Sequence, residues 1–272
     1  MPELICGGFR LDLGRPRIMA IINLTPDSFS GDGHHRDHDR ALRHAERCIE
    51  QGADLVDLGG ESSRPGAEPV AEDEELARVI PVVERLAGCG VPISVDTVKP
   101  AVMRAAIAAG ASMINDIRGF TDPAAVAAVR DSEVGLCVMH MQGEPRSMQD
   151  DPAYADVVAE VEEFLGRQLA RLENHGVARS RVVVDPGFGF GKRRGHNEAL
   201  FRNIGRLAKT APVMVGVSRK SVLGMVTGRE VGDRLLPSVV AALLAAQKGA
   251  AILRVHDVAE TRDALRLLEA FG

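Results

Sequence analysis

Residues 18–23 read I-M-A-I-I-N: five apolar residues that end in an asparagine, with a polar segment after them. A continuous apolar run, as opposed to a strict alternation of apolar and polar residues, is typical of a strand covered on both faces, as in parallel sheets. The same pattern recurs at 54-DLVDL, 92-PISVD, 112-SMIND, 136-LCVMH, 181-RVVVD, 213-VMVGV and 251-AILRV. The sequence therefore predicts eight parallel strands.

Amphipathic segments rich in Ala, Leu, Glu and Arg lie between these strands. Examples are 39–52, where Asp39 is a candidate N-cap, 72–88 and 155–176. Strand–helix units repeated in this way over 272 residues fit a (β/α)₈ barrel, which typically has about 250 residues. A doubly wound open sheet competes, but no G-x-G-x-x-G follows the first strand. We predict a single (β/α)₈ TIM barrel, and residues 1–272 form one domain because no linker divides them.

Composition and charge argue against several classes of protein. The net charge of −5, the single Tyr and the lack of Trp do not suit a nucleic-acid surface. No apolar run approaches the roughly 20 residues that cross a bilayer, and no secretory signal is apparent at the N-terminus. The four cysteines are scattered singly, which favours a reduced cytoplasmic protein over a disulfide framework or a zinc site.

Polar or charged residues end nearly every predicted strand, and in TIM barrels the catalytic groups lie at these carboxyl ends. A single strand-end Asp is most often a helix cap or a loop anchor. A ring of such residues accompanied by cations indicates a ligand site instead. The ring consists of Asn23, Asp57, Asp96, Asn115, Asp116, His140, Asp185, Ser218, Arg219, Lys220, Arg254 and His256.

The chemistry of these residues divides into acceptors and cations. The acceptors are Asp96, Asn115 and Asp185, and the cations are Arg64, Lys220, Arg254 and His256. Such a set suits a ligand with a guanidine-like, donor-rich edge at one end and an anion at the other. Clustered Arg and Lys near helix N-termini, with an Asn that can hold Mg²⁺ through its carbonyl oxygen, indicate a diphosphate. For any single Arg, a salt bridge that seals a loop remains the alternative.

Two further motifs have ordinary explanations. The run G-F-G-F-G-K at 187–192 lacks the spacing of a phosphate-binding P-loop. Met139 alternates with its neighbours along a strand, so core packing is its default role, although it could form the apolar wall of a ligand pocket.

Motifs along nearly the whole chain resemble those of the bacterial dihydropteroate synthases, a family of pterin-binding TIM barrels. They are 23-NLTPDSFS, 57-DLGGESSRPGA, 94-SVDTVKP, 114-INDIRGF, 138-VMHMQGEPRSMQ, 185-DPGFGFGK, 215-VGVSRKS and 254-RVHDV. The resemblance implies a transferase of folate synthesis that joins 7,8-dihydropterin-6-ylmethyl diphosphate to 4-aminobenzoate, releasing pyrophosphate by an S_N1-like path with Mg²⁺. It also implies a cytoplasmic homodimer, small-molecule substrates and inhibition by sulfonamides.

The resemblance also assigns roles to individual residues. Lys220, Asp96 and Asp185 are implied as catalytic residues. The implied pterin pocket consists of Asp96, Asn115, Met139, Asp185, Gly216 and Lys220, and the diphosphate ligands are Asn23, Ser63, Arg64, Arg254 and His256, with Asn23 as the metal ligand. The residues implied around 4-aminobenzoate are Phe29, Ser63, Pro65, Phe190, Lys220 and Ser221.

The chain departs from the family pattern in two loops. The family commonly has D-S-F-S-D-G-G in the first loop, whereas residues 27–33 read D-S-F-S-G-D-G, so that Asp32 is displaced by one place. In the second loop Ser63 stands where a Thr is common; it keeps the hydroxyl, so diphosphate binding should survive.

Two alternative functions follow from the same residues. A methyltetrahydrofolate-binding methyltransferase domain would share the pterin acceptors but would not need the diphosphate cations of S-S-R-P-G, S-R-K-S and R-V-H. A catalytically silent pterin-binding barrel is the other, and the presence of Asn23, Arg64, Lys220 and Arg254 argues against it.

Overall fold

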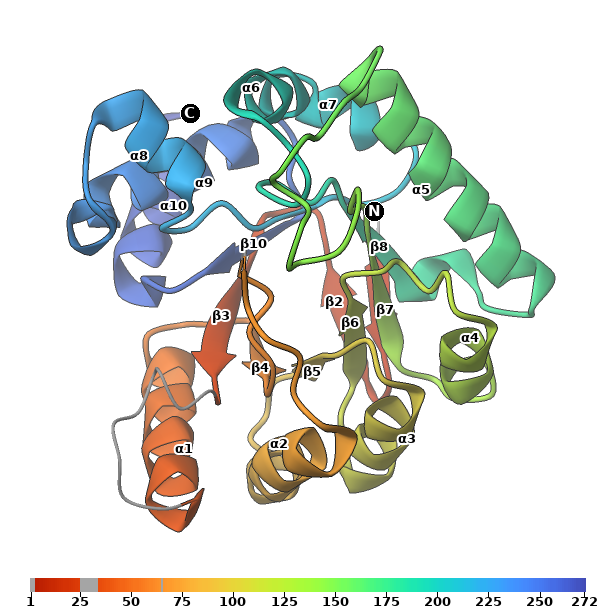
Figure 1. Cartoon of the computed structure of the whole chain (residues 1–272). Coiled ribbons are helices and arrows are strands. Elements are labelled where there is room, and N and C mark those ends of the chain that lie inside the picture. The colour runs from red at the N-terminus through yellow and green to blue at the C-terminus, as the bar shows by residue number, and fades with distance from the viewer. Residues whose placement is uncertain (1–2, 25–33, 65) are drawn as a thin grey trace.

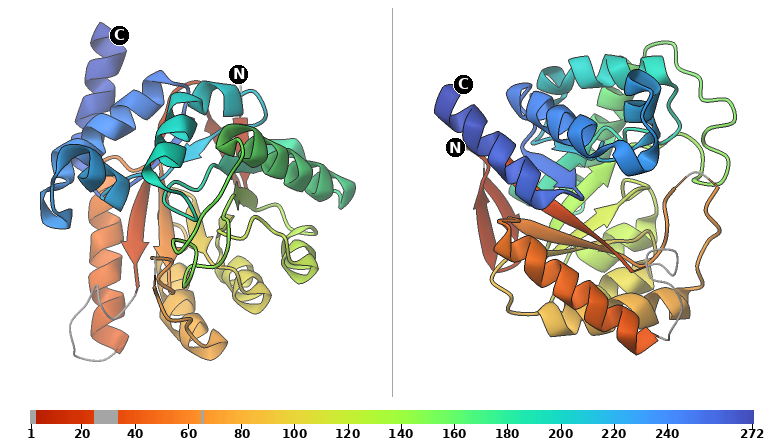
Figure 2. Two further views of the ribbon diagram at one scale, coloured as in Figure 1. Left: turned by 45° about the horizontal axis from the view of Figure 1, so that its top comes forward. Right: turned by 90° about the vertical axis from the view of Figure 1, so that its left-hand side faces the viewer.

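The computed structural model describes residues 3–24, 34–64 and 66–272, and for residues 34–37 it describes the backbone alone. Strands and helices alternate along the chain, and the helices surround the strands (Figures 1 and 2). The strands are β1 Glu3–Cys6, β2 Phe9–Asp12, β3 Arg17–Asn23, β4 Leu55–Gly59, β5 Ile93–Asp96, β6 Met113–Asp116, β7 Gly135–Met139, β8 Val182–Asp185, β9 Met214–Val215 and β10 Ile252–Val255.

The helices follow the strands in the order that a (β/α)₈ barrel requires. They are α1 His34–Glu50, α2 Glu72–Leu86, α3 Pro100–Ala109, α4 Pro123–Val129, α5 Val157–Asn174, α6 Arg194–Arg202, α7 Ile204–Leu207, α8 Ser221–Thr227, α9 Leu235–Gln247 and α10 Val258–Phe271, with 3₁₀ turns at Arg179–Arg181 and Val231–Asp233.

Strands β3 to β10 form one parallel sheet in the order β8-β7-β6-β5-β4-β3-β10-β9. The two edge strands meet through a parallel bridge between Val184 and Val213, and the Val184 amide donates to the Pro212 carbonyl at 2.9 Å. The sheet is therefore a nearly closed barrel, and the predicted fold and its eight strands are confirmed.

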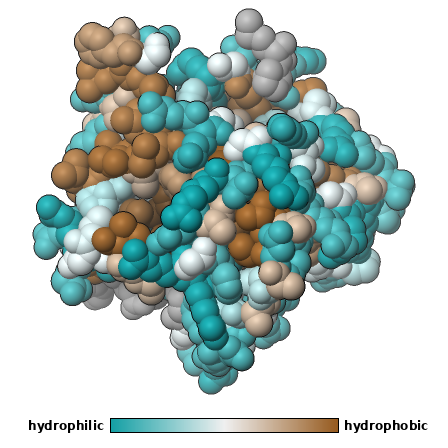
Figure 3. All heavy atoms as spheres, turned by 90° about the horizontal axis from the view of Figure 1, so that it is seen from above, coloured by the Kyte–Doolittle hydropathy of each residue, from teal (hydrophilic) through white to brown (hydrophobic). Residues whose placement is uncertain are grey.

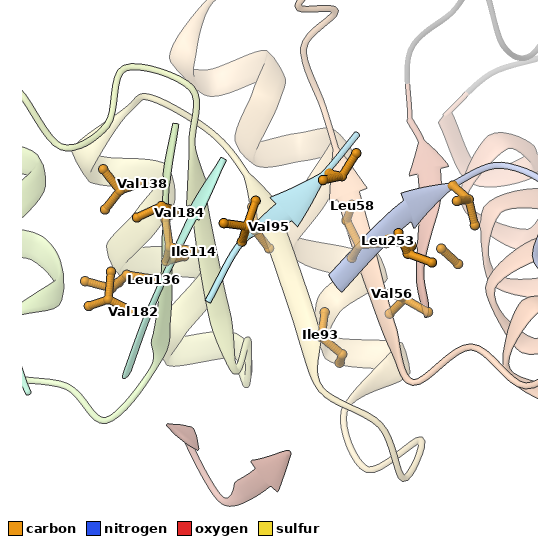
Figure 4. Close-up of a cluster of buried hydrophobic side chains, with 14 of the residues drawn as sticks. Val56, Leu58, Ile93, Val95, Ile114, Leu136, Val138, Val182, Val184 and Leu253 are labelled. Atoms are coloured by element: carbon orange, nitrogen blue, oxygen red, sulfur yellow. The ribbon is translucent and has the colours of Figure 1, made fainter. Parts of the chain in front are cut away.

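The larger hydrophobic core lies between the strands and the helices. Val56 and Leu58 of β4 belong to the same buried cluster as Val79 and Val83 of α2. Figure 4 shows side chains of this cluster on β4 to β8 and on β10. Burying each such Val or Leu contributes about 1.5–3 kcal/mol. Because this core includes elements from both halves of the chain, we propose that the chain forms one domain, as the sequence predicts.

A second core fills the inside of the barrel. It comprises Met19, Leu55, Met113, Cys137, Val183, Met214 and Ile252, with Leu4, Cys6 and Leu13 from the N-terminal segment. The hairpin of β1 and β2, which the sequence reasoning missed, therefore closes the amino ends of the strands. A Cβ on Gly135 would lie 2.9 Å from the Cys6 sulfur, so the packing there is close. Ligands must enter at the carboxyl ends.

Helix α1 begins at His34, five residues before the predicted N-cap, so the assignment of Asp39 as an N-cap is wrong. The Asp39 carboxylate lies inside the helix and pairs instead with the Arg85 guanidinium of α2, at 2.6 Å. In the described part of the chain, no helix is long and apolar enough to span a membrane.

Candidate active site

The predicted acceptors lie side by side at the carboxyl ends of their strands. Asp96 of β5 is paired in register with Asn115 of β6, and Met139 of β7 is paired with Asp185 of β8. Asn115, Met139 and Asp185 are buried, and the Asp96 side chain is 12% exposed. The sequence predicted this grouping because parallel strands end at the same edge of a sheet.

Arg254 of β10 reaches across the barrel mouth to two carboxylates. Its Nε donates to Asp57 Oδ2 at 2.6 Å, and its Nη2 donates to Asp96 Oδ2 at 3.1 Å. Burial raises the pKa of Asp96 to about 7, and the Arg254 charge opposes that shift. Burial also disfavours the charge on Arg254, but Asp57 and Asp96 more than offset this, so the pKa of Arg254 is raised. The guanidinium therefore stays charged.

Asp57 belongs to this group; it is a member of the predicted ring of strand-end residues, although no individual ligand role is predicted for it. Its side chain is fully buried, and Oδ2 also accepts from the Asn115 amide at 3.3 Å. Asp57 Oδ1 and Asn115 Oδ1 have no hydrogen-bond partner among the described residues. Buried acceptors without partners usually await water, an ion or a ligand. The barrel mouth is thus prepared to accept hydrogen bonds from a donor-rich molecule.

Asp185 is the second buried carboxylate of the pocket. Its Oδ1 accepts from the Gly187 amide at 2.7 Å. On the other side lies Gly216, where a Cβ would stand 3.7 Å from Asp185 Oδ2 and 3.8 Å from the Arg254 side chain. Glycine at position 216 therefore leaves space beside the carboxylate. Burial raises the pKa of Asp185, and the Lys220 charge opposes that shift.

Lys220 lies between the acceptors and an aromatic wall. Its ammonium donates to the Phe188 carbonyl at 2.6 Å and lies 4.6 Å from the centre of the Phe190 ring. Burial lowers the pKa of Lys220 to about 8, and Asp185 opposes that shift. Phe190 packs against Met139 in a small buried cluster. Met139 therefore forms part of an apolar wall, as the sequence analysis allowed.

His256, at the carboxyl end of β10, was predicted as a cation, and the structure corrects this. Burial lowers the pKa of His256 to about 3, with help from the Arg254 charge, so the ring is neutral at pH 7. Its Nδ1 lies 3.0 Å from Ser218 Oγ, and its amide donates to the same hydroxyl at 3.2 Å. In this arrangement the neutral His256 ring can contribute a hydrogen bond to an anion.

Four of the remaining predicted residues lie in the described part of the chain. Asn23 is half-buried at the end of β3, where it is paired in register with Gly59. Ser63 is half-buried, and Arg64 and Ser221 are exposed. Phe29, Asp32 and Pro65 lie outside the described residues.

Half-buried ion pairs and a buried hydrogen bond anchor the segment that carries Ser63 and Arg64. The Lys99 ammonium pairs with the carboxylates of Glu61 and Glu75. Arg78 donates to the Gly60 carbonyl at 2.8 Å. The start of this loop is therefore fixed to α2 and α3.

The described residues contain no group of three or more His, Cys, Asp or Glu that could hold a metal ion. As far as the described residues go, a metal at this mouth would take most of its ligands from a bound molecule or from water. Mg²⁺ commonly binds in this way, through one or two protein oxygens and substrate phosphates. The Asn23 carbonyl oxygen at the rim fits that arrangement.

Comparison with known proteins identifies related chains. The family model described as "Pterin binding enzyme" matches residues 19–256. The dihydropteroate synthase of Escherichia coli K12 is 47% identical over 273 residues, which cover 98% of this chain and 96% of the relative.

Solved structures of high similarity carry bound small molecules. The dihydropteroate synthase of Xanthomonas albilineans with 4-aminobenzoic acid is 51% identical, with a TM-score of 0.93 over 99% of this chain and 97% of that one. That of Burkholderia cenocepacia with 7,8-dihydropteroate is 52% identical, with a TM-score of 0.89 over 98% and 95%. A Yersinia pestis sulfonamide complex is 46% identical, with a TM-score of 0.93 over 98% of each chain.

Proposed function

This chain belongs to the family of pterin binding enzymes, and from that membership we infer that it is a dihydropteroate synthase. The reaction joins 7,8-dihydropterin-6-ylmethyl diphosphate to 4-aminobenzoate and releases pyrophosphate. One observation about the site carries the assignment: buried acceptors, a lysine and an aromatic wall converge at one barrel mouth. Relatives named for this activity match nearly the full chain.

We propose that the pterin binds among the buried acceptors. Its 2-amino and ring N–H groups form a guanidine-like edge that suits the Asp185 carboxylate and the unpartnered Asn115 Oδ1. The Arg254 guanidinium, a group of related shape, donates hydrogen bonds to Asp57 and Asp96. Gly216 leaves the space for a flat ring, and Met139 lies beside it. The Lys220 ammonium is proposed to donate a hydrogen bond to the acceptor edge of the pterin.

The diphosphate end of the substrate is assigned to the rim. Arg64 and Arg254 supply positive charge, and Ser63 and neutral His256 supply hydrogen bonds. Asn23 is the protein ligand proposed for Mg²⁺. When bound, the ion would neutralise charge that develops on the leaving diphosphate.

The proposed reaction needs little acid–base chemistry from the protein. The C–O bond to the diphosphate breaks, and its electron pair leaves with the phosphate oxygen. The electron-rich dihydropterin stabilises the methylene cation that remains, which makes the path S_N1-like. The amine lone pair then forms the C–N bond, and the proton lost from nitrogen passes to water. Catalysis rests on positioning and on stabilisation of charge.

The arylamine is assigned to the outer side of the pocket. Phe190 offers a ring face, Lys220 offers a cation for the carboxylate, and Ser221 lies at the start of α8. Ser63, Phe29 and Pro65 are proposed to complete this subsite. Since the Yersinia pestis relative is described with a sulfonamide drug, sulfonamides are proposed to compete for the same subsite.

Neither alternative function gains support from the site. A methyl-transferring barrel has no use for the cations and hydroxyls at the rim, and a silent barrel has no need for a half-buried lysine beside the acceptors. The cytoplasmic location stays a prediction.

Removal of divalent metal should abolish activity, and Mg²⁺ should restore it. In Asn23→Ala the Mg²⁺ concentration for half-maximal rate should rise about tenfold, since loss of one ligand costs about 1.4 kcal/mol. Titration of pyrophosphate release with Mg²⁺ measures this, with Asn174→Ala at the exposed end of α5 as the control. A full rate in excess EDTA would contradict the metal assignment.

We also propose that the chain forms a homodimer through an apolar surface on α8, α9 and α10. The exposed side chains of this surface are Met225, Val226, Val231, Leu235, Leu236, Val240, Leu244, Leu267 and Phe271. Figure 3 shows hydrophobic side chains gathered on the left, where Figure 1 draws these helices. Large exposed apolar patches commonly mark protein–protein interfaces, and stable interfaces bury about 1,200–2,000 Å² in total.

The double substitution Leu236→Glu/Val240→Glu should convert a dimer into a monomer. The two residues are four apart on α9 and therefore share one face. Light scattering should give about twice the chain mass of 29.1 kDa for the wild type and one chain mass for the variant. Arg104→Glu on α3, which changes the net charge equally, is the control. A monomeric wild-type protein would refute this interface.

Pyrophosphate release tests the proposed function itself. Purified protein with both substrates and Mg²⁺ should release pyrophosphate continuously, and omission of 4-aminobenzoate should limit release to a single turnover at most. No release above the blank with both substrates would overturn the assignment.

A further inference from the structure

The loop after β8 is held in place by side chains along its length. The carbonyls of residues 188–193 each accept a hydrogen bond from a side chain. Phe188 O accepts from Lys220 (2.6 Å), Gly189 O from Gln149, Phe190 O from Lys192 (2.9 Å), Gly191 O from Tyr154 (2.8 Å), and Lys192 O and Arg193 O from Asn197 (3.1 and 2.9 Å). These hydrogen bonds fix the conformation of the loop.

Lys192 is the buried member of this set that joins two loops. Its side chain points inward and is 3% exposed, so the G-F-G-F-G-K run does not present its lysine as a phosphate-binding loop does. The Lys192 ammonium lies 2.9 Å from Phe190 O, 3.3 Å from His140 O and 3.0 Å from His140 Nδ1. An ammonium has three N–H donors, and these three acceptors match them. Lys192 thus ties the loop after β8 to the end of β7.

The two loops also approach each other too closely for ordinary side chains. Gly187 has a φ of +70°, and a Cβ there would overlap the His140 carbonyl oxygen. The His140 amide donates to the Asp185 carbonyl at 3.0 Å. The contact between the two loops therefore reaches the backbone of Asp185, whose side chain is the pocket carboxylate.

Stability alone does not account for an ammonium at this place. Among the described residues, no carboxylate forms an ion pair with Lys192. Burial lowers the pKa of Lys192 to about 7, although the Asp185 charge opposes that shift. Burying an amine has a desolvation cost even when it is hydrogen-bonded, and an apolar side chain would fill the site without that cost. We therefore look for the role of Lys192 in the groups that its ammonium binds, the carbonyls of Phe190 and His140.

Lys192 binds the backbone carbonyl of Phe190, and the ring of Phe190 faces the pocket. Its ring packs with Ile117, Met139 and Met148, and the Lys220 ammonium lies 4.6 Å from the ring centre. We propose that Lys192 is a positioning residue that acts through the Phe190 carbonyl to set the aromatic wall for the arylamine. This inference rests on the proposed function, because that function supplies the arylamine.

The test compares the two substrates in Lys192→Met, which keeps an unbranched stem one atom shorter and removes the three donors. The KM for 4-aminobenzoate should rise about tenfold, equal to about 1.4 kcal/mol. The KM for the dihydropterin diphosphate should rise much less, because Asp96 and Asn115 lie on other strands and the Asp185 carboxylate is held by the Gly187 amide, which Lys192→Met leaves in place. Lys209→Met, at an exposed lysine, is the matched control and should change neither value.

The outcomes separate this inference from the proposed function. An inactive wild-type protein refutes both, whereas an active wild type with an unchanged 4-aminobenzoate KM in Lys192→Met refutes only the role of Lys192. An equal rise in both KM values, with a lower melting temperature, indicates a purely structural lysine and also overturns the proposal. If Lys192→Met does not fold, Lys192→Gln should show the same selective rise; if neither folds, the lysine is structural and the proposal fails.

Discussion

Replacing Asp185 by asparagine should lower kcat/KM for pyrophosphate release by about two to three orders of magnitude. The Asp185 carboxylate is buried and accepts only one hydrogen bond that the structure shows, from the Gly187 amide at 2.7 Å. Its second oxygen is proposed to accept from the pterin edge. The asparagine amide would direct N–H groups at a donor edge, so the loss combines a charge-assisted hydrogen bond with an unpaired donor, about 3–4 kcal/mol together.

Measurement of the melting temperature distinguishes this loss from unfolding. Burial raises the pKa of Asp185, so the folded protein disfavours its charge, and the neutral asparagine should be no less stable at pH 7. Asp131→Asn, at an exposed carboxylate, should leave both activity and stability unchanged. An Asp185→Asn enzyme with wild-type kcat/KM would remove Asp185 from the pterin site.

Replacing Lys220 by methionine should lower kcat/KM by about two orders of magnitude, because one ammonium is proposed to serve both substrates. The ammonium lies 4.6 Å from the centre of the Phe190 ring and close to the Asp185 charge. Methionine keeps the apolar contact with the ring but removes the charge. Steady-state kinetics should show higher KM values for both substrates, whereas Lys248→Met at an exposed position should show neither.

The pH dependence offers an independent check on Lys220. Burial lowers its pKa to about 8, with Asp185 opposing, so the ammonium loses its proton as the pH rises through that value. Wild-type kcat/KM should therefore fall above about pH 8, and this decline should be absent from Lys220→Met. On the acid side, activity should fall as the raised pKa of Asp185 is crossed and its carboxylate becomes protonated. A decline above pH 8 that persists in Lys220→Met would assign it to another group.

The strands of the barrel were predictable because each is a continuous apolar run, as burial on both faces requires. The hairpin of β1 and β2 could not be predicted in this way. Its burial depends on the interior of the barrel, where Leu4 belongs to the same cluster as residues far along the chain, such as Met113. The start of α1 was placed too late because Asp39 suits a cap locally, whereas in the fold it pairs with Arg85 of α2.

The membership of the site was also largely predictable, since strand order brings Asp96, Asn115 and Asp185 together. The protonation states and charge pairing of these residues could not be predicted from the sequence. The neutral state of His256 follows from burial beside Arg254, and the role of Asp57 follows from the direction in which Arg254 points. These properties depend on contacts between elements far apart in the sequence, which no local pattern encodes. The assignment of individual roles came from the resemblance, and those roles stay predictions.

Isotope tracing of the product tests the central claim most directly. Purified protein with the dihydropterin diphosphate, Mg²⁺ and ¹⁵N-labelled 4-aminobenzoate should form labelled 7,8-dihydropteroate, detected by its mass, with one pyrophosphate released for each molecule formed. Pyrophosphate without labelled dihydropteroate, or neither product above the blank, would contradict the assignment of this barrel as the enzyme that forms the C–N bond.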